Sequence, residues 1–453
     1  MTSMVVSDVP TAKQRKQARG AGIAALVGTT LEWYDFLIYG TAAAVILNEV
    51  FFPTADPVVG TLAAFASYAI GFLARPLGGL ILGNMGDKLG RKKMLLFTIV
   101  LMGLATTAIG LLPTYAAIGV AAPILLVLLR LLQGFGAGGE YAGAVVLSVE
   151  HGDQKKRGAA GAWAPLGFAL ATLLSAGVFQ LAVLLPEEAF KSWGWRVPFL
   201  LGAALLVVGY VIRLRISETP VFEEAQKEAQ KAAASGQAAV QKGSMFAAIR
   251  QHPRNFLIVI GARFAENSFA YLFPVFAVGF TVNQLGLPSS LTLLSVVIAS
   301  AVQVVMVPVW AILSDRVGRR PVYAGGAIAS IIWLPIFFIL LETESPAAII
   351  LGFVLGLGVF YPAMLAPQAA YFAELFDTKT RLSGFAFGRE IGSVLAGGFF
   401  PLIATALLAA TGHWWAVVAY AAVLTLITLV ALAFGPETKD ENIQDVPSEA
   451  GKP

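Results

Sequence analysis

The sequence predicts an all-α membrane protein with twelve transmembrane helices in two pseudo-symmetric six-helix bundles. Three observations predict this fold class. The composition is too apolar for a water-soluble chain, twelve apolar runs are long enough to cross a bilayer, and an internal repeat divides the chain in two.

The composition favours lipid as the solvent of this chain. Of its 453 residues, 57% are hydrophobic and only 13% are charged, whereas soluble domains carry about 25% charged residues. The 46 glycines are typical of helices that pack closely inside a membrane. With no cysteine and three widely separated histidines, we expect no disulfide, no thiol chemistry and no metal site.

A transmembrane helix needs about 20 mostly apolar residues, and the sequence offers twelve such runs. They cover residues 20–47, 58–82, 94–112, 120–148, 159–185, 196–214, 255–282, 289–313, 321–341, 347–373, 383–410 and 414–434.

The charges between these runs predict the orientation. With twelve spans, the Lys and Arg clusters all fall on one side, whereas the loops on the other side carry mainly Asp and Glu. Because Lys and Arg mark cytoplasmic loops, we expect an inner-membrane protein with both termini cytoplasmic. The net charge of +4 is therefore interpreted as a topology signal rather than as a sign of nucleic-acid binding. The first apolar run is too long for a cleavable signal peptide.

The same pattern predicts five regions. These are a cytoplasmic N-terminal tail at 1–19, a first bundle at 20–214, a cytoplasmic linker at 215–254, a second bundle at 255–436 and a cytoplasmic C-terminal tail at 437–453. The linker is rich in Ala, Gln, Glu and Lys. We interpret it as a passive connection, with a regulatory domain as the alternative.

The internal repeat joins the two halves. Residues 83–93 (GNMGDKLGRKK) follow the second span, and residues 311–321 (AILSDRVGRRP) follow the eighth, about half the chain later. Two halves of this kind enclose a cavity near the middle of the membrane. A second matched pair, with equal spacing, follows the fourth and tenth spans: Glu150 with Arg157, and Glu374 with Arg381.

Residues 83–93 resemble the hallmark loop of the major facilitator superfamily, and residues 130–140 resemble its second motif. The chain is more narrowly similar to the metabolite:H⁺ symporter family, whose members include transporters of shikimate, α-ketoglutarate, citrate, aromatic acids and proline/betaine. The resemblance covers the whole chain and implies the major facilitator fold. The stretches that carry it are 32–36 (EWYDF), 75–79 (RPLGG), 139–143 (GEYAG), 193–199 (WGWRVPF) and 217–222 (SETPVF).

The resemblance implies that the loop after the second span latches the two halves in the outward-facing state. In that loop Asp87 ends one helix and Arg91 begins the next, while Gly83 and Gly90 allow a tight turn. A purely topological role for the basic residues is the alternative.

The second copy of the loop is expected to act in the same way but less tightly, because Ala311 replaces the usual first glycine. The predicted gate therefore also includes Asp315, Arg319, Glu150, Arg157, Glu374 and Arg381.

Charges inside the spans are the second set of candidates, because a charge at the bilayer centre costs about 2.5–3.5 kcal/mol and needs a cavity or a partner. Glu32 and Asp35 are three residues apart and share one face of the first helix. Two carboxylates this close favour a bound proton on one of them. Glu140 is a third proton-coupling candidate, and Arg130 is a proton relay or a substrate partner. Structural ion pairs are the alternative for each.

Two arginines are candidates for binding an anionic group, because a guanidinium clamps a carboxylate with two hydrogen bonds. Arg263 lies in a polar stripe of the seventh span, and Arg389 lies beside Glu390 in the eleventh. Since Arg389 and Glu390 point about 100° apart on a helix, we do not expect both to face one neighbour. The substrate-binding candidates are Arg263, Arg389, Glu266, Asn267, Tyr34, Glu390 and Arg75.

Together these features predict a secondary active transporter that takes up a small organic acid or zwitterion with protons, by alternating access. An osmolyte symporter, a proton-coupled antiporter and a sensor that has lost transport are the alternatives. No phosphate-binding Gly-x-x-x-x-Gly-Lys-Ser/Thr loop and no catalytic residue set is present, which argues against a pump or an enzyme. We expect a carboxylate-bearing substrate, protons and lipid as partners, no nucleic acid, no cofactor beyond the proton gradient, and a monomer.

Overall fold

A computed structural model describes residues 12–54, 56–89, 91–138, 140–150, 156–215, 245–378 and 380–441. These residues form helices joined by short loops, and none of them lies in a β-strand.

Among the described residues, the first half contains six long helical elements. They are α1 (Ala12–Val45), α3 (Pro57–Leu89), α4 (Arg91–Leu111), α6 and α7 (Ala121–Ala137 and Glu140–Glu150), α9 (Trp163–Ala182) and α11 (Val197–Arg215). Short helices lie between them: α2 (Leu47–Val50), α5 (Tyr115–Ile118), α8 (Arg157–Gly161), α10 (Glu187–Ser192) and the 3-10 turn η2 (Gly194–Arg196).

The described part of the second half begins with α13 (Met245–Gln251) and also has six long elements, three of which contain a π-helical turn. They are α14–η3–α15 (Pro253–Tyr271, Leu272–Phe276, Ala277–Asn283), α16 (Ser289–Val317), α17 (Arg319–Glu342), α18–η4–α19 (Pro346–Phe353, Val354–Phe360, Pro362–Glu374), α20–η5–α21 (Arg381–Ser393, Val394–Gly398, Phe400–Thr411) and α22 (Trp415–Phe434).

Within the described residues, ten of these twelve elements are long and apolar enough to span a membrane. The other two are α1, which begins with a basic segment and carries Glu32 and Asp35, and α4, whose apolar part is limited to Leu96–Leu111. The predicted fold class is confirmed. The tails before residue 12 and after residue 441, and linker residues 216–244, lie outside the described residues.

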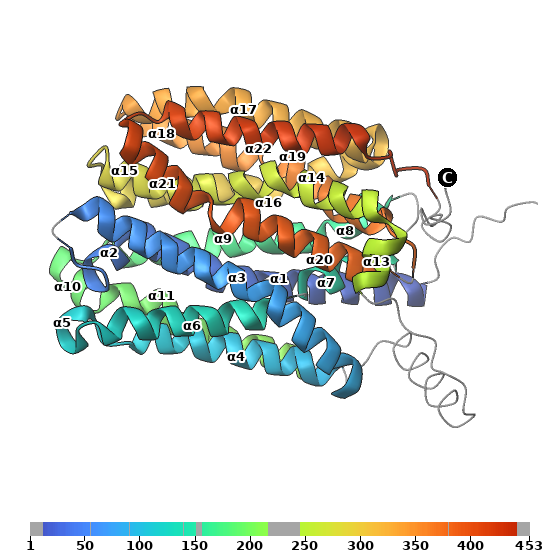
Figure 1. The fold of residues 1–453 in the computed structure, drawn as a ribbon, viewed down its shortest axis with the longest axis horizontal. Coiled ribbons are helices and arrows are strands. Elements are labelled where there is room, and N and C mark those ends of the chain that lie inside the picture. The colour runs from blue at the N-terminus through green and yellow to red at the C-terminus, as the bar shows by residue number, and fades with distance from the viewer. Residues whose placement is uncertain are drawn as a thin grey trace, which may run out of the picture.

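The two halves lie side by side, with their helices running along a common direction (Figure 1). Helix α1 begins and α22 ends at the same end of the bundle, which also holds Arg157, Arg319 and Arg381 and is called the basic end. The other end, with Glu49 and Glu187, is called the acidic end. The halves meet where α9 packs on α16, α3 on η5, α7 on α20, and α1 on η3.

Within the first half, α3 and α6 touch backbone to backbone. A Cβ on Gly78 would overlap the carbonyl group of Phe135, and one on Gly134 would overlap the carbonyl oxygen of Gly71. A Cβ on Gly138 would meet the backbone of Gly79. Small residues allow such contacts in membranes, so these glycines fix how closely the two helices approach.

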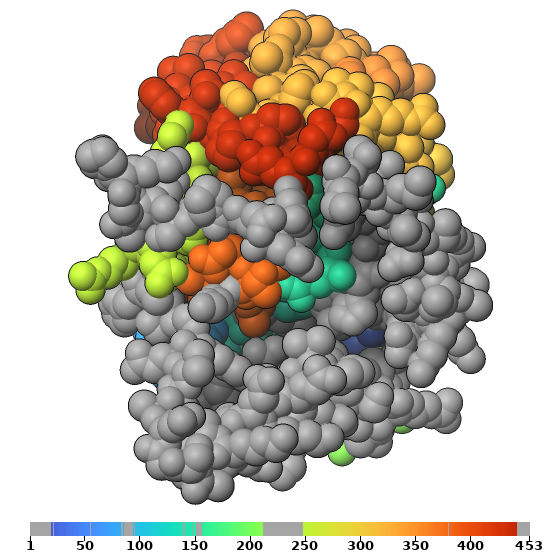
Figure 2. All heavy atoms as spheres, turned by 90° about the vertical axis from the view of Figure 1, so that its right-hand side faces the viewer, coloured from blue at the N-terminus to red at the C-terminus, as the bar shows by residue number. Residues whose placement is uncertain are grey.

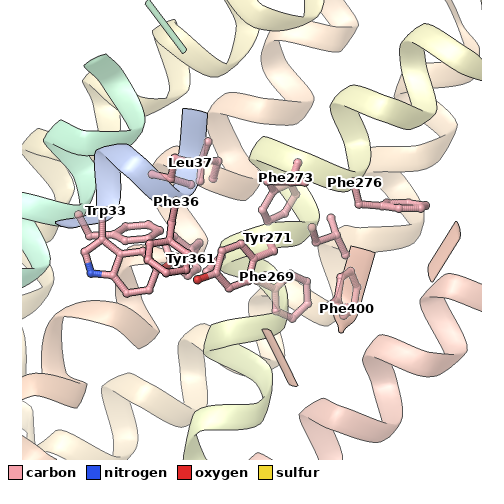
Figure 3. Packing of buried hydrophobic residues seen from close by; sticks show 14 of the residues in the cluster. Trp33, Phe36, Leu37, Phe269, Tyr271, Phe273, Phe276, Tyr361 and Phe400 are labelled. Carbon is pink, nitrogen blue, oxygen red and sulfur yellow. The ribbon is translucent and has the colours of Figure 1, made fainter. Parts of the chain in front are cut away.

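Aromatic side chains fill the interface between the halves (Figure 3). Trp33 and Phe36 of α1 lie near Tyr271 and Tyr361 of the second half, with 6.3 Å between the ring centroids of Trp33 and Tyr271. A further row continues away from them in the second half: Phe269, Phe273, Phe276 and Phe400.

Candidate functional site

Buried charges meet at the centre of the interface. Arg75 on α3 donates from Nη2 to Glu32 Oε1 at 2.6 Å and from Nε to Glu390 Oε2 at 2.7 Å. It therefore joins α1 of the first half to α20 of the second. Arg389 Nη1 donates to Glu390 Oε1 at 2.7 Å. Arg389 and Glu390 also reach different neighbours, since Glu390 contacts Arg75 and the Arg389 guanidinium lies over the Tyr141 ring.

A second buried pair lies on α14. Arg263 donates to Glu266 and also to Gln368 Oε1, at 2.8 Å. Gln368 Nε2 donates to Glu266 Oε2 at 3.1 Å, and the Tyr361 hydroxyl donates to Glu266 Oε1 at 2.8 Å. Arg263 and Glu266 thus neutralise each other within the second half, and Gln368, which the sequence did not single out, completes the arrangement.

Aromatic rings cover the central arginines. The Arg75 guanidinium lies 4.7 Å from the ring centroid of Phe36 and 5.2 Å from that of Trp33. The Arg389 guanidinium lies 3.8 Å from the centroid of Tyr141 and 5.6 Å from that of Trp33. Such cation–π contacts stabilise a desolvated cation and orient both guanidinium groups at the interface.

Several buried polar atoms at this centre have no hydrogen-bond partner within the described part of the chain. They are Arg75 Nη1, Arg389 Nε, Trp33 Nε1, Glu32 Oε2 and Asn267 Oδ1. Leaving such groups unsatisfied costs about 1–3 kcal/mol each, and native structures contain few of them. Most of these atoms are donors, which suits a ligand rich in acceptor oxygens.

The other predicted coupling residues lie beside this centre. Asp35 and Glu32 line one pocket between α1, α4 and α11. Arg130 on α6 stacks on Tyr39 at 4.0 Å and donates to Gln133. The Glu140 side chain lies outside the described residues.

Tyr34 does not join the central charges. Its buried hydroxyl donates to the Pro198 carbonyl oxygen at 2.8 Å, inside the first half. Asn267 does lie near the interface, where its Nδ2 donates to the Ser393 carbonyl oxygen at 3.1 Å.

The predicted gate residues meet at the basic end. Arg157 Nε lies 3.1 Å from Glu374 Oε1, and Arg381 Nη1 lies 2.6 Å from Glu150 Oε1. Each ion pair joins one half to the other, so the matched sequence pairs connect crosswise. Figure 2 views this end, where green first-half residues lie between orange and red segments of the second half.

The second copy of the repeated loop also forms hydrogen bonds with the first half. Asp315 accepts hydrogen bonds from the backbone N–H groups of Gly158 at 2.8 Å and Ala159 at 2.9 Å, and from Arg319 at 2.7 Å. A Cβ on Gly158 would lie 2.8 Å from the backbone carbonyl oxygen of Ala311, so this close approach requires glycine. The first copy lies outside the residues whose side chains are described: Gly83, Asp87, Gly90 and Arg91.

Residues 437–441, which the sequence suggested to be a tail, bind to this gate. Arg157 Nη2 donates to three carbonyl oxygens of residues 438–441, at 2.9 to 3.2 Å. The Glu437 carboxylate accepts the backbone N–H groups of Arg319 at 2.8 Å and Arg320 at 3.0 Å. Glu437 lies 118 residues from Arg319 in the sequence, so no local pattern predicted this contact.

The contacts between the two halves at the acidic end differ from those at the basic end. Asn283 Nδ2 donates to the Ala44 carbonyl oxygen at 3.1 Å, and no ion pair joins the two halves there among the described residues. A pocket between the halves at this end is lined by Thr61, Phe65 and Phe276, among others. The described contacts therefore close the basic end more firmly than the acidic end.

Comparisons with known proteins agree with this architecture. The family model described as "Sugar (and other) transporter" matches residues 21–449. The shikimate transporter of Escherichia coli (strain K12) is 38% identical over 407 residues, which cover 89% of this chain and 91% of that protein. The proline/betaine transporter of Salmonella typhimurium is 36% identical over 413 residues, covering 91% and 82%.

Among solved structures, the xylose transporter XylE from E. coli, in a partially occluded inward-open conformation, matches with a TM-score of 0.73 at 15% identity. The match covers 94% of this chain and 100% of XylE, and it supports the twelve-helix fold. The relatives are transporters and not enzymes. The chain belongs to the sugar (and other) transporter family within the major facilitator superfamily, as a multi-span membrane transporter.

Proposed function

We propose that this secondary transporter is a proton-coupled symporter that takes up a small organic acid, by alternating access and without a cofactor. In this proposal it acts as a monomer in the inner membrane with the basic end on the cytoplasmic side. The observation that carries the proposal is the charge balance of the central cluster.

The central cluster contains three arginines and three glutamates, so it is neutral when all six are ionised. Its members are Arg75, Arg263, Arg389, Glu32, Glu266 and Glu390. A monoanion that enters leaves one negative charge in excess, which is expensive in a low-dielectric site. A proton on one carboxyl group restores neutrality. Glu32, with one unsatisfied oxygen, is suited to accept it, and Asp35 lines the same pocket.

Arg389 is the better anion-binding candidate of the two predicted arginines. Arg263 already has Glu266 and Gln368 as partners, whereas Arg389 Nε and the nearby Arg75 Nη1 are unsatisfied donors. Two such donors suit the two oxygens of a carboxylate.

Anion binding at this position would also bias the conformational equilibrium. Arg75 holds Glu390 across the interface, so a substrate carboxylate competes with Glu390 for the same guanidinium. A ligand shifts a two-state equilibrium by its difference in affinity for the two states. Weakening the Arg75–Glu390 contact thus favours separation of the halves on one side.

A zwitterionic osmolyte is the second candidate substrate, favoured by the identity to a proline/betaine transporter. Its ammonium group would require a free aromatic face. The Trp33 and Tyr141 rings are already covered by Arg75 and Arg389, which favours the organic acid.

The test begins with purified protein and a thermal-stabilisation screen of organic acids, including shikimate, alongside proline and betaine. A stabilising compound is then supplied to proteoliposomes with an inward proton gradient. We expect uptake that a protonophore abolishes, and at least a tenfold loss in Arg389→Gln but not in the exposed control Lys191→Gln. Exchange without any response to the gradient would contradict proton coupling, and stimulation by an opposing gradient would indicate an antiporter.

A further inference from the structure

Gln303, in the middle of α16, is a buried amide without a partner. Its side chain is fully buried, and neither Oε1 nor Nε2 has a hydrogen-bond partner within the described part of the chain. The buried serine hydroxyls of the same helix each donate to a carbonyl oxygen of α16: Ser295, Ser300 and Ser314. Native structures contain few unsatisfied buried groups, because each is costly, which indicates that this amide does more than hold its helix in place.

Gln303 points away from lipid. The exposed side chains of Val305, Val309 and Ile312 mark the lipid-facing side of α16. With 3.6 residues per turn, Gln303 lies on the side of the helix opposite to Val305. The elements packed against α16 include α9 of the first half and η4 of the second. The amide is therefore directed towards the interface between the halves.

Close backbone contact with η4 fixes the depth of Gln303. A Cβ on Gly358 would lie 2.8 Å from the Ala299 carbonyl oxygen, so η4 and α16 touch at this point. Gln303 follows Ala299 by about one turn of α16. In the neighbouring element, Tyr361 follows Gly358 by about one turn, and both helices run towards the basic end. Gln303 and Tyr361 therefore lie at a similar depth.

This depth is also that of the central cluster. The Tyr361 ring centroid lies 6.0 Å from that of Phe168 on α9, which lies 5.1 Å from that of Trp33. Trp33 in turn lies 5.2 Å from the Arg75 guanidinium and 5.6 Å from that of Arg389. Only a layer of aromatic side chains therefore separates the buried amide from the two arginines proposed to bind the carboxylate.

The chemistry of an amide limits what can satisfy it. Gln303 offers a donor at Nε2 and an acceptor at Oε1. A carboxylate only accepts hydrogen bonds and an ammonium group only donates them, so either would leave one of these atoms unsatisfied. A hydroxyl group both donates and accepts, and it can satisfy the two atoms together.

We propose that Gln303 is a specificity-determining residue that binds a hydroxyl group of the substrate, and that the substrate is a hydroxylated carboxylic acid. Its carboxylate lies at Arg389 and Arg75, and its hydroxyl group reaches the amide when α9 moves against α16 during alternating access. An acid without a hydroxyl group leaves the amide unsatisfied and binds more weakly. This inference rests on the proposed uptake of an organic acid and concerns the same site.

The test compares the affinities of pairs of acids that differ only in their hydroxyl groups, by thermal stabilisation of the purified protein. The pairs are shikimate and cyclohexenecarboxylate, malate and succinate, lactate and propionate, and citrate and tricarballylate. We expect the wild-type protein to bind the hydroxylated member of at least one pair about tenfold more tightly. Gln303→Met, which keeps the length of the side chain and removes the amide, should bind both members with the same affinity.

Ser300→Ala is the matched control. The Ser300 hydroxyl is buried about one turn away on the same helix, but it already donates to the Val296 carbonyl oxygen at 2.7 Å. This variant should keep the wild-type preference for the hydroxylated acid. A preference that is equal in Gln303→Met and Ser300→Ala, or a wild-type protein that binds acids but discriminates within no pair, would overturn the inference while leaving the proposed function intact.

Thermal unfolding without any acid decides whether the amide is structural. Because Gln303→Met removes an unsatisfied buried group, its unfolding temperature should equal or exceed that of the wild-type protein. A lower unfolding temperature, or failure to fold, would show that the amide has a structural partner and would contradict its assignment to the substrate. If no acid of any pair stabilises the wild-type protein, the proposed uptake of an organic acid itself fails, and the unfolding temperature still decides the role of Gln303.

Discussion

In the second half of the molecule, Arg263 binds Glu266 directly, and Gln368 and Tyr361 fill the remaining positions around that carboxylate. In the first half, neither Asp35 nor Arg130 forms an ion pair within 4.0 Å among the described residues, and Arg130 donates instead to Gln133 and to the Tyr68 carbonyl oxygen. Breaking a direct buried pair leaves an uncompensated charge, which costs about 3–5 kcal/mol. A carboxyl group without a direct partner can gain or lose a proton at lower cost. The comparison therefore supports the proposal that protons exchange in the first half, whereas the second half holds a fixed polar framework.

The largest loss of transport and stability is expected for substitution of Arg75, which joins the two halves. Arg75→Gln leaves Glu32 and Glu390 buried without their shared cation, so we expect loss of transport and destabilisation by about 3–5 kcal/mol. Uptake in proteoliposomes and thermal unfolding measure both effects. Arg75→Gln with Glu390→Gln removes one charge of each sign and should recover part of the stability. Wild-type uptake by Arg75→Gln would refute the bridging role.

Two neutralising substitutions test whether loss of a buried carboxylate costs more stability in the second half than in the first. Glu266→Gln leaves Arg263 without its carboxylate and should lower stability by about 3 kcal/mol. Asp35→Asn resembles the protonated state, so it should keep wild-type stability and exchange while losing proton-driven uptake. Denaturation and counterflow assays measure these outcomes. Equal destabilisation by the two variants would remove the distinction drawn between the halves.

A smaller effect is expected at the basic end. Glu374→Gln weakens the contacts of both Arg157 and Arg319, and a loss of about 1.4 kcal/mol would raise the population open at this end about tenfold. Because the chain contains no cysteine, spin labels at Lys156→Cys and Thr378→Cys report the distance between the halves by double electron–electron resonance.

The control for this experiment is Lys191→Gln at the acidic end, where an exposed ion pair with Glu49 should be worth less than about 1 kcal/mol. It should leave the distance distribution unchanged. A distribution for Glu374→Gln that matches this control would show that the buried ion pairs do not hold the basic end closed.

The twelve helices could be predicted because the bilayer imposes a minimum length on each apolar run. The charges inside those runs could be identified for the same reason, since each is costly in lipid. The partners of these charges could not be predicted. Arg75 contacts Glu32 and Glu390 on two distant helices, and the sequence does not specify how these helices are rotated against each other.

Other features left little trace in the sequence. Gln368 and Tyr141 are uncharged, and such residues are common in helices of every kind. The π-helical turn at Leu272–Phe276 adds a residue to the helical repeat. An ideal α-helical repeat therefore predicts the wrong face for residues that follow this turn. Residues 437–441 are polar, and only the folded gate gives them binding partners.

The backbone contact between α3 and α6 has a consequence for how this gene can vary. Every amino-acid replacement at Gly78, Gly134 or Gly138 adds at least one methyl group, and each would overlap main-chain atoms of the other helix. No neighbouring side chain can move aside, because the obstacle is backbone. These positions therefore tolerate no missense change without displacing a whole helix, and the spacing of α3 and α6 is expected to persist in descendants whose substrate has changed.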